Sequence, residues 1–352
     1  MKKFLPEVCT IQYGFPFDSA KFSDSDGMPL IRIRDVVRGY SETYTTEEYK
    51  SEYIVHENDL LIGMDGEFNI AKWGKIPALL NQRVCRLAPK DSIDKDYLFY
   101  FMPIALKRIE EKTPFVTVKH LSAKELNKIE IPVLPLEEQR KIAETLSKVD
   151  ELIAFRDQQL AKLDELVKAR FVEMFTANES NFPMTALNDL CKEIFAGGDK
   201  PSEMSQIQTD EFEFPVYANG YENLGLQGFA KNYRVEEKSV TISARGTIGY
   251  SFIREGRYTP IVRLITAVPG DKLNVVYLKY SIDMLDIKSS GTSQAQLTVP
   301  NFKKMKIMEP PLPLQNEFAV FVERVDQQKQ AVQQSLEKLE LMKKALMQEY
   351  FG

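Results

Sequence analysis

A segment near the middle of the chain returns, changed but in register, at the end of the chain. Residues 136–175 align with residues 312–351 at a shift of 176 positions, and no gap is needed. A self-match of fixed period over such a length indicates duplication. Since the 352 residues are twice 176, we expect two copies of one unit. The register is shown by the pairs Leu136/Leu312, Gln139/Gln315, Asp150/Asp326, Leu160/Leu336 and Phe175/Phe351.

The globular parts of the two copies are less alike than these segments. Residues 235–249 resemble residues 55–69, with Gly66 and Gly246 aligned at a shift of 180. Residues 297–313 then align with 121–137 at the original shift of 176. Between these anchors the copies differ in sequence and in local length. This contrast predicts a shared scaffold that presents a different binding surface in each copy.

Both repeated segments predict long amphipathic helices that pack on each other. Their apolar residues recur at heptad spacing, which is typical of a coiled coil. A helix of roughly 40 residues is about 60 Å long, much longer than an ordinary core helix. Arg156 and Arg170 interrupt the first apolar seam, and Lys329 and Lys343 interrupt the second, so the two helices are not interchangeable. The residues expected to form the spacer helices and partner-binding seams are Leu146, Val149, Ile153, Leu160, Leu163, Val167, Val325, Val332, Leu336, Leu339 and Leu346.

These patterns predict an α+β fold of two similar globular α/β domains, each followed by a long helix. If a pseudo-twofold axis relates the domains, the helices form an antiparallel coiled coil. A parallel coiled coil that dimerises the chain stays open as an alternative. Residues 97–111 have helical spacing, and Pro103 predicts that this shorter helix is broken or begins there. The expected domains are 1–135 and 181–311, with the helices in 136–180 and 312–352.

The charge, the apolar runs and the few cysteines and histidines limit the kinds of function that the chain can have. The net charge is −5, from 46 Lys and Arg against 51 Asp and Glu, so nucleic acid cannot be held by bulk basicity alone. Local patches or a partner's positive surface would have to contribute. No apolar run resembles a signal peptide or a membrane span, so we expect a cytoplasmic protein. The three cysteines, Cys9, Cys85 and Cys191, are isolated, and the matching places of Cys9 and Cys191 predict small buried side chains. The histidines His56 and His120 are too far apart to suggest zinc.

The sequence matches known catalytic motifs only incompletely. Residues 309–312, Glu-Pro-Pro-Leu, faintly resemble an amino-methyltransferase motif but lack its aromatic residue, and they lie in the repeated connection to the long helix. Glu110 and Lys112 suggest a nuclease pattern that occurs once in a duplicated chain. Glycines such as Gly197 and Gly246 lack the spacing of phosphate-binding loops. We therefore expect neither catalytic residues nor a metal site.

Several polar loops suit the reading of nucleic acid, although a solvated loop or a role in the fold is the competing interpretation for each. Arginine, lysine and small amide or hydroxyl side chains donate to phosphates and to base edges. In the first copy the candidates are Arg32, Arg34, Asn69, Lys72, Lys75, Lys112, Thr113, Thr117 and Lys119, with Trp73 and His120 beside them. In the second copy they are Asn219, Tyr221, Arg245, Thr247, Ser290, Thr292, Ser293, Gln294 and Gln296.

Taken together, these features resemble the specificity subunits of type I restriction-modification enzymes. The resemblance covers the full length. It is carried by IPVLPLEEQRKIAETLSKVDELI (131–153) and PPLPLQNEFAVFVERVDQQK (310–329), each opening a long helix, and by GTSQAQLTVPNFKKM (291–305). One departure is that the first copy has no clear counterpart of residues 289–296, and residues 112–117 stand at the matching place.

The resemblance implies a non-catalytic chain whose two target-recognition domains each read one half of an asymmetric, bipartite DNA site. It implies antiparallel helices that act as spacer and dock. It also implies two adenine-methylating modification subunits, which carry S-adenosylmethionine, and two motor-nuclease restriction subunits. Two other classes stay open at this point: an adaptor or anti-restriction protein that binds protein partners, and an enzyme with an unfamiliar site.

The spacer role leads to a prediction. Inserting a few residues between Val149 and Val167 should change the number of unspecified base pairs between the half-sites, because the helices fix the separation of the domains. Mapping methyladenine in DNA from cells that express the variant with its modification subunit measures this number. A change in the bases of either half-site would contradict the spacer role.

Overall fold

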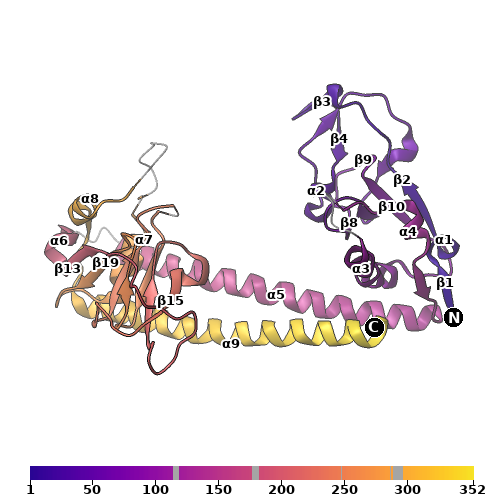
Figure 1. The fold of residues 1–352 in the computed structure, drawn as a ribbon. Helices are drawn as coiled ribbons and strands as arrows, with labels where there is room; N and C mark the ends of the chain where they lie inside the picture. The colour runs from indigo at the N-terminus through magenta and orange to yellow at the C-terminus, as the bar shows by residue number, and fades with distance from the viewer. Residues whose placement is uncertain (114–118, 177–181, 247, 286, 288–295) are drawn as a thin grey trace. The chain divides into compact units, whose positions relative to one another are not determined.

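The chain folds into two compact units, each of which combines a globular part with segments of two long helices (Figure 1). The computed structural model describes residues 1–113, 119–176, 182–246, 248–285, 287 and 296–352. Unit 1 consists of Met1–Arg156 and Ser335–Gly352, and unit 2 is Asp157–Gln334. The long helices are α5 (Leu136–Phe175) and α9 (Leu312–Phe351), each of 40 residues.

The main sheet of unit 1 has the strand order β2-β10-β7-β8, with antiparallel pairing throughout. Its strand β7 is buried at every position because both faces are covered. Leu60 and Ile62 belong to the core that includes helix α3, whereas Leu61 packs in a separate cluster with Val36 of helix α2. This alternation is the period of two that a strand imposes. The bounds are β2 (Cys9–Tyr13), β7 (Leu60–Gly63), β8 (Asn69–Lys72), β10 (Val84–Pro89), α2 (Ile33–Arg38) and α3 (Lys95–Lys112).

The main sheet of unit 2 repeats this plan in the order β13-β19-β16-β17, again antiparallel. Val240 and Ile242 of β16 pack in one core with Tyr277 and Leu278 of α7, as Leu60 and Ile62 of β7 pack with α3 in unit 1. The duplication inferred from the sequence is therefore present in the fold. The bounds are β13 (Cys191–Ala196), β16 (Ser239–Ile242), β17 (Ser251–Arg254), β19 (Ile265–Pro269) and α7 (Val275–Asp283).

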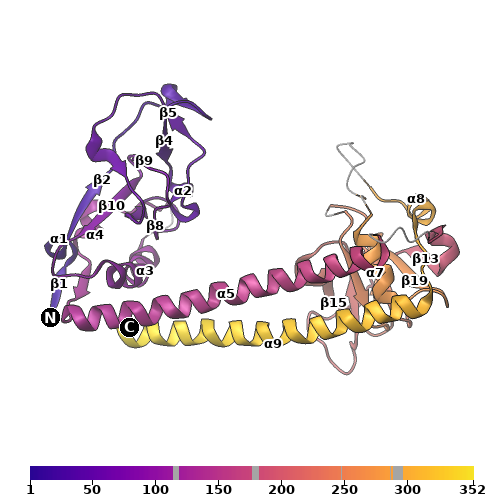
Figure 2. The same ribbon diagram turned by 180° about the vertical axis from the view of Figure 1, so that it is seen from behind.

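A short antiparallel strand pair joins the beginning and the end of each globular part. In unit 1, β1 pairs with β11, and Figure 2 shows the N terminus beside the start of α5. In unit 2, β12 pairs with β20. Ser122 and Thr298 cap the short helices that precede the returning strands. The bounds are β1 (Lys2–Phe4), α1 (Leu5–Val8), α4 (Ala123–Asn127), β11 (Glu130–Pro132), β12 (Met184–Ala186), α6 (Leu187–Leu190), α8 (Val299–Lys304) and β20 (Lys306–Met308).

The additional strands differ between the units. Unit 1 carries strands in the order β3-β5-β4-β9-β6, in which β4 and β9 are parallel. Unit 2 carries β15-β14-β18 in the corresponding part of its sequence. The divergent middles of the two copies are thus divergent in structure. The bounds are β3 (Phe22–Ser23), β4 (Met28–Ile31), β5 (Tyr44–Thr45), β6 (Ile54–Val55), β9 (Ala78–Leu80), β14 (Phe214–Tyr217), β15 (Leu226–Ala230) and β18 (Thr259–Pro260).

Within each unit the segments of α5 and α9 run antiparallel. As residue numbers rise along α5, those of its partners on α9 fall, so the parallel alternative is wrong for this chain. The four charged residues that interrupt the apolar seams, Arg156, Arg170, Lys329 and Lys343, each bond to a side chain of the other helix. These contacts hold the two helices in register. The contacts are Asp150–Lys343 (2.5 Å) and Arg156–Ser335 (3.1 Å) in unit 1, and Asp164–Lys329 (2.5 Å) and Arg170–Glu317 (3.3 Å) in unit 2.

The seam residues of both helices are buried or half-buried. The ends of the helices also enter the domain cores through aromatic contacts. In unit 1 the ring of Phe351 lies 5.2 Å from that of Tyr97 on α3. In unit 2 the equivalent ring of Phe175 lies 4.8 Å from that of Tyr277 on α7. Each globular part is therefore packed against both helices.

The expected interruption at Pro103 is wrong, because α3 runs through this residue without a break. Pro103 lies on the exposed side of the helix, where its missing N–H removes one backbone hydrogen bond. The opposite face is anchored by Tyr97, Leu98 and Phe101, all of which are buried. Burial of this face outweighs the local cost of the proline.

A buried glutamine near the start of each long helix fixes the helix to its globular part. Gln139 is fully buried, and its Oε1 accepts from the backbone N–H of Asp94 at 2.8 Å. Its Nε2 donates to the carbonyls of Ser92 (3.2 Å) and Leu134 (2.7 Å). One carboxamide thus provides hydrogen-bond partners for backbone groups in the turn before α3 and in the segment between β11 and α5.

Gln315 of unit 2 repeats these contacts at equivalent positions. Its Oε1 accepts from the backbone N–H of Asn274 at 2.8 Å. Its Nε2 donates to the carbonyls of Lys272 (3.0 Å) and Pro310 (2.8 Å). The duplicated chain therefore retains the same polar anchor in both units.

We predict that Gln139→Met lowers the free energy of unfolding of unit 1 by roughly 2–4 kcal/mol, because three half-buried backbone groups lose their partner to an apolar side chain. Urea denaturation, with hydrogen exchange in α3 as the local readout, measures the effect. Gln158→Met is the matched control, since Gln158 is an exposed residue of the same helix. Equal stability of the two variants would show that the anchor contributes nothing.

Candidate nucleic-acid interface

In unit 2, two loops beside the main sheet are tied together by Asn219. Its Nδ2 donates to the carbonyl of Val262 at 2.6 Å, and its Oδ1 accepts from the backbone N–H of Ala244 at 2.8 Å. The backbone N–H of Gly220 donates to Ser243 Oγ at 3.1 Å. These bonds join residues 218–225 to the loop that follows β16, so Asn219 positions the loops through backbone contacts.

An aromatic pair lies on the surface of these loops. The rings of Tyr221 and Tyr250 are stacked, with centroids 5.5 Å apart and planes 28° from parallel. Their exposed fractions are 54% and 42%. Tyr250 was not among the residues predicted from the sequence, although its position directly after Gly249 at the end of a repeated loop was an available signal. Exposed stacked rings with hydroxyl tips can contact bases or sugars.

A buried arginine, Arg254, supports the loop formed by residues 218–225. Arg254 is 4% exposed, and its Nη2 donates to the carbonyl of Leu224 at 2.6 Å, where φ is 53°. Its Nε donates to Thr241 Oγ1 at 2.9 Å, and its guanidinium lies 3.6 Å from the ring centroid of Tyr217. Burial lowers the pKa of Arg254. The left-handed backbone at Leu224 is therefore held by a buried cation.

Arg245 and Gln296 meet at the tip of the second loop. The backbone N–H of Leu297 donates to the carbonyl of Ala244 at 3.0 Å, which brings residue 296 beside residue 245. Arg245 Nη2 donates to Gln296 Oε1 at 3.3 Å, and both side chains are exposed. The structure thus brings together Asn219, Tyr221, Arg245 and Gln296, all predicted from the sequence. Thr247, Ser290, Thr292, Ser293 and Gln294 lie outside the described residues.

Unit 1 has an equivalent loop after β7. The backbone N–H of Leu121 donates to the carbonyl of Met64 at 2.7 Å, and that of Gly66 donates to the carbonyl of Lys119 at 2.9 Å. Asp65 Oδ1 lies 2.5 Å from His120 Nδ1. Asp65 was not among the residues predicted from the sequence, although its alignment with Arg245 at a shift of 180 was an available signal.

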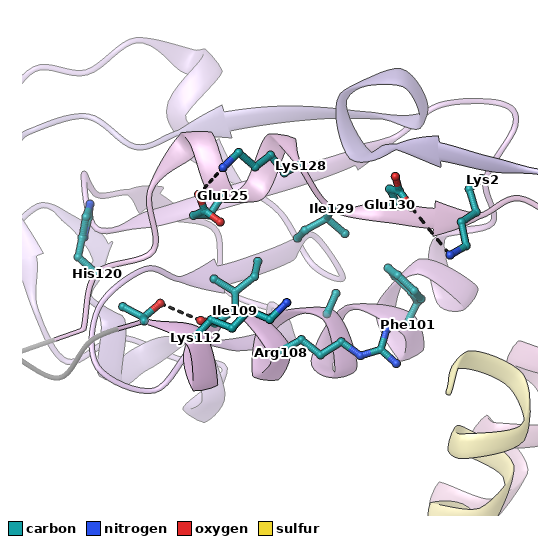
Figure 3. A pocket seen from close by; sticks show the side chains of 12 residues that line it. Lys2, Phe101, Arg108, Ile109, Lys112, His120, Glu125, Lys128, Ile129 and Glu130 are labelled. Carbon is teal, nitrogen blue, oxygen red and sulfur yellow. Dashed lines mark hydrogen bonds and ion pairs between the residues drawn. The ribbon is translucent and has the colours of Figure 1, made fainter.

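Lys112 and Thr113 line a groove of about 750 Å³ in unit 1, together with His120 (Figure 3). The groove has apolar side chains, such as Phe101 and Ile129, and a charged rim. On that rim, Lys128 pairs with Glu125 at 2.9 Å, and Lys2 pairs with Glu130 at 3.9 Å. Thr117 lies outside the described residues.

The other candidates of unit 1 lie elsewhere, and most are engaged by the scaffold. Lys119 pairs with Glu110 at 3.4 Å, and Lys72 pairs with Asp96 at 2.9 Å. Asn69 is half-buried on β8, where its Nδ2 donates to the carbonyl of Glu67 at 3.2 Å. Arg32, Arg34 and Lys75 are exposed at or near α2, and Trp73 is buried with its indole N–H bonded to the carbonyl of Ile76.

The cysteines are not suited to reactive thiol chemistry. Burial raises the pKa of the thiols of Cys9, Cys85 and Cys191 to about 12. Such thiols remain protonated and pack as small apolar groups. In the part of the chain that the structure describes, no cluster of His, Cys, Asp and Glu is arranged to hold a metal ion, and no helix is long and apolar enough to cross a membrane.

Comparison with known proteins identifies the family. The model of the type I restriction modification DNA specificity domain matches the chain twice, over residues 1–165 and 179–341. The chain belongs to this family. The match covers both copies of the repeat, and it confirms the resemblance seen in the sequence.

Two relatives illustrate the extent of the similarity. The specificity subunit of the Escherichia coli type I restriction enzyme EcoBI is 42% identical over 164 residues, which are 46% of this chain and 34% of that protein. This chain therefore matches only about a third of the length of the E. coli relative. The putative type I specificity subunit S.MpnORF507P of Mycoplasma pneumoniae is 26% identical over 321 residues, which are 90% of this chain and 86% of that protein.

Solved structures of type I specificity subunits share the fold. The crystal structure of the S subunit of a type I restriction-modification system from M. genitalium matches with a TM-score of 0.63 at 17% identity, and the match covers 100% of this chain and 96% of that one. A structure from work on complex assembly and conformational transition of the type I system gives 0.62 at 18% identity, covering 100% and 97%. This likeness supports the mixed α/β fold with long helices.

The loop cluster of this type I specificity chain leads to a prediction about unit 2. Asn219→Ala should raise hydrogen exchange in residues 218–225 and 243–246 and lower the free energy of unfolding by about 1–3 kcal/mol, because two backbone groups lose their partner. Mass-spectrometric hydrogen exchange measures the local effect. Asn188→Ala, an exposed change in α6 of the same unit, is the control. Unchanged exchange in both loops would mean that Asn219 does not join them.

Proposed function

We propose that this chain is the DNA-recognition subunit of a type I restriction-modification complex, in which each unit reads one half of an asymmetric, bipartite site. The observation that carries the proposal is a shared scaffold with different reading surfaces. The sheets β2-β10-β7-β8 and β13-β19-β16-β17 have one topology, yet the loops and additional strands beside them differ. Two copies of one framework with unlike loops are suited to two unlike half-sites.

The loops of unit 2 carry the side-chain chemistry that major-groove recognition uses. Arginine bonds guanine O6 and N7, and amide side chains bond adenine N6 and N7. Arg245 and Gln296 are exposed on one loop tip, beside the stacked Tyr221 and Tyr250. Asn219 and Arg254 hold the loops that present these groups, so few atoms need to move when DNA binds.

In this proposal, partner subunits supply the chemistry. Two modification subunits with bound S-adenosylmethionine would methylate adenine, and two restriction subunits would cleave DNA. The net charge of −5 supports a shared interface, because the modification subunits can provide positive surface that this chain lacks. The long helices α5 and α9 would serve as dock and spacer. An adaptor that binds only proteins is less favoured, since the family match is to a DNA specificity domain.

A map of modified bases tests the proposal. DNA from a methylation-free host that expresses this chain with a cognate modification subunit should contain methyladenine in one asymmetric motif split by unspecified bases. The same modification subunit alone should give no such motif. Single-molecule sequencing measures both samples. An active, assembled complex that methylates without any bipartite motif would contradict recognition by this chain.

A further inference from the structure

The two units place a hydrogen-bonded side-chain pair at the same point of the scaffold. In unit 1 the backbone bond from Leu121 to Met64 (2.7 Å) sets residue 120 beside residue 65. In unit 2 the bond from Leu297 to Ala244 (3.0 Å) sets residue 296 beside residue 245. The pairs 65/120 and 245/296 are therefore structural equivalents, although their side chains differ.

The first residue of each pair lies directly before a glycine turn. Gly66 and Gly246 directly follow the first member of each pair and have φ values of 77° and 67°. A Cβ at either glycine would meet no atom within 4 Å among the described residues. Among the described residues, nothing crowds these left-handed glycines, as a loop that must approach a ligand closely requires.

In unit 1, the loop residue accepts the hydrogen bond. Asp65 Oδ1 lies 2.5 Å from His120 Nδ1, and Asp65 Oδ2 lies 3.5 Å from Arg83 Nε. A carboxylate oxygen can only accept, so Nδ1 of the imidazole donates in this pair. Nε2 is the ring nitrogen left for a ligand, as an acceptor when the ring is neutral and as a donor when it is protonated. The His120 side chain is 49% exposed, so the ring is accessible to a ligand.

In unit 2, the polarity is reversed. The loop residue Arg245 donates to the carboxamide oxygen of Gln296, and both side chains are exposed. A guanidinium has five N–H donors, so the contact with Gln296 orients it while other donors stay available. The exposed group of this pair is therefore a cationic donor, whereas that of unit 1 is an imidazole held by a carboxylate.

We propose that these equivalent pairs, Asp65/His120 and Arg245/Gln296, determine which base pair each unit reads at one position of its half-site. The proposal rests on the function proposed above and deepens it. Arg245 fits the O6 and N7 acceptors of guanine. The Nε2 of His120, when it accepts, fits an exocyclic amino group, as in adenine or cytosine. A guanidinium in one unit and an imidazole in the other let the two units select different bases.

Exchange of the pairs tests this inference with the full chain assembled with its modification subunit. The double variant Asp65→Arg/His120→Gln gives unit 1 the pair of unit 2. On a library of randomised half-sites, sequencing of methylated products should show a change of about tenfold or more in preference at one base pair of a single half-site. The other half-site and the spacing should be unchanged. The reciprocal variant Arg245→Asp/Gln296→His should change only the other half-site.

Asp91→Arg is the matched control, because it makes the same change of charge at an exposed turn of unit 1. It should leave both half-sites unaltered. If an exchanged chain folds poorly, Asp65→Asn and Arg245→Lys test the same groups with little change in shape. Each should weaken selectivity at the same base pair as the corresponding exchange.

The outcomes separate the two proposals. A wild-type complex that gives no bipartite motif contradicts the proposed function. A wild-type motif with unchanged base preferences in all variants overturns the role of the pairs alone. Weaker methylation with unchanged preferences also overturns it, since that result means that the pairs only hold the loops.

Discussion

The structure depends on one buried carboxamide at the start of each long helix. Gln139 and Gln315 each connect a helix, the turn before the domain helix and the strand exit through three hydrogen bonds. An amide can make these bonds because it both donates and accepts. Since both glutamine side chains are fully buried, the backbone groups that face them meet no water there and would otherwise lack a hydrogen-bond partner. The anchor therefore fixes the helix to the globular part at its base.

Because each globular part is attached to its long helix in this way, the strands farther from the attachment can differ between the units. The rings of Phe351 on Tyr97 and of Phe175 on Tyr277 add the same apolar contact in both units. Beyond this shared core, unit 1 builds β3-β5-β4-β9-β6 and unit 2 builds β15-β14-β18. The strands that diverge are therefore the ones that the helix anchor does not require.

The period of the sequence was enough to predict the paired helices, but it could not predict the loop contacts. Repeats and heptads act over fixed spacings, whereas Asn219 bonds to Val262, 43 positions away, through geometry that only the folded loops supply. Lysines were selected for their charge, and yet Lys72 is paired with Asp96. The expected break at Pro103 was wrong because burial of the opposite helix face decides the local structure.

The acidic balance of the chain is compatible with DNA recognition once binding and selection are separated. Affinity for DNA comes largely from phosphate contacts, whereas base choice depends on a few groups at groove edges. A carboxylate at a reading loop, such as Asp65, repels phosphate in isolation. Arg83 Nε lies 3.5 Å from Asp65 Oδ2 and offsets the charge of this carboxylate, which also orients the His120 ring through a hydrogen bond to Nδ1. An acidic residue can therefore belong to a reading site when a partner subunit carries the task of holding the DNA.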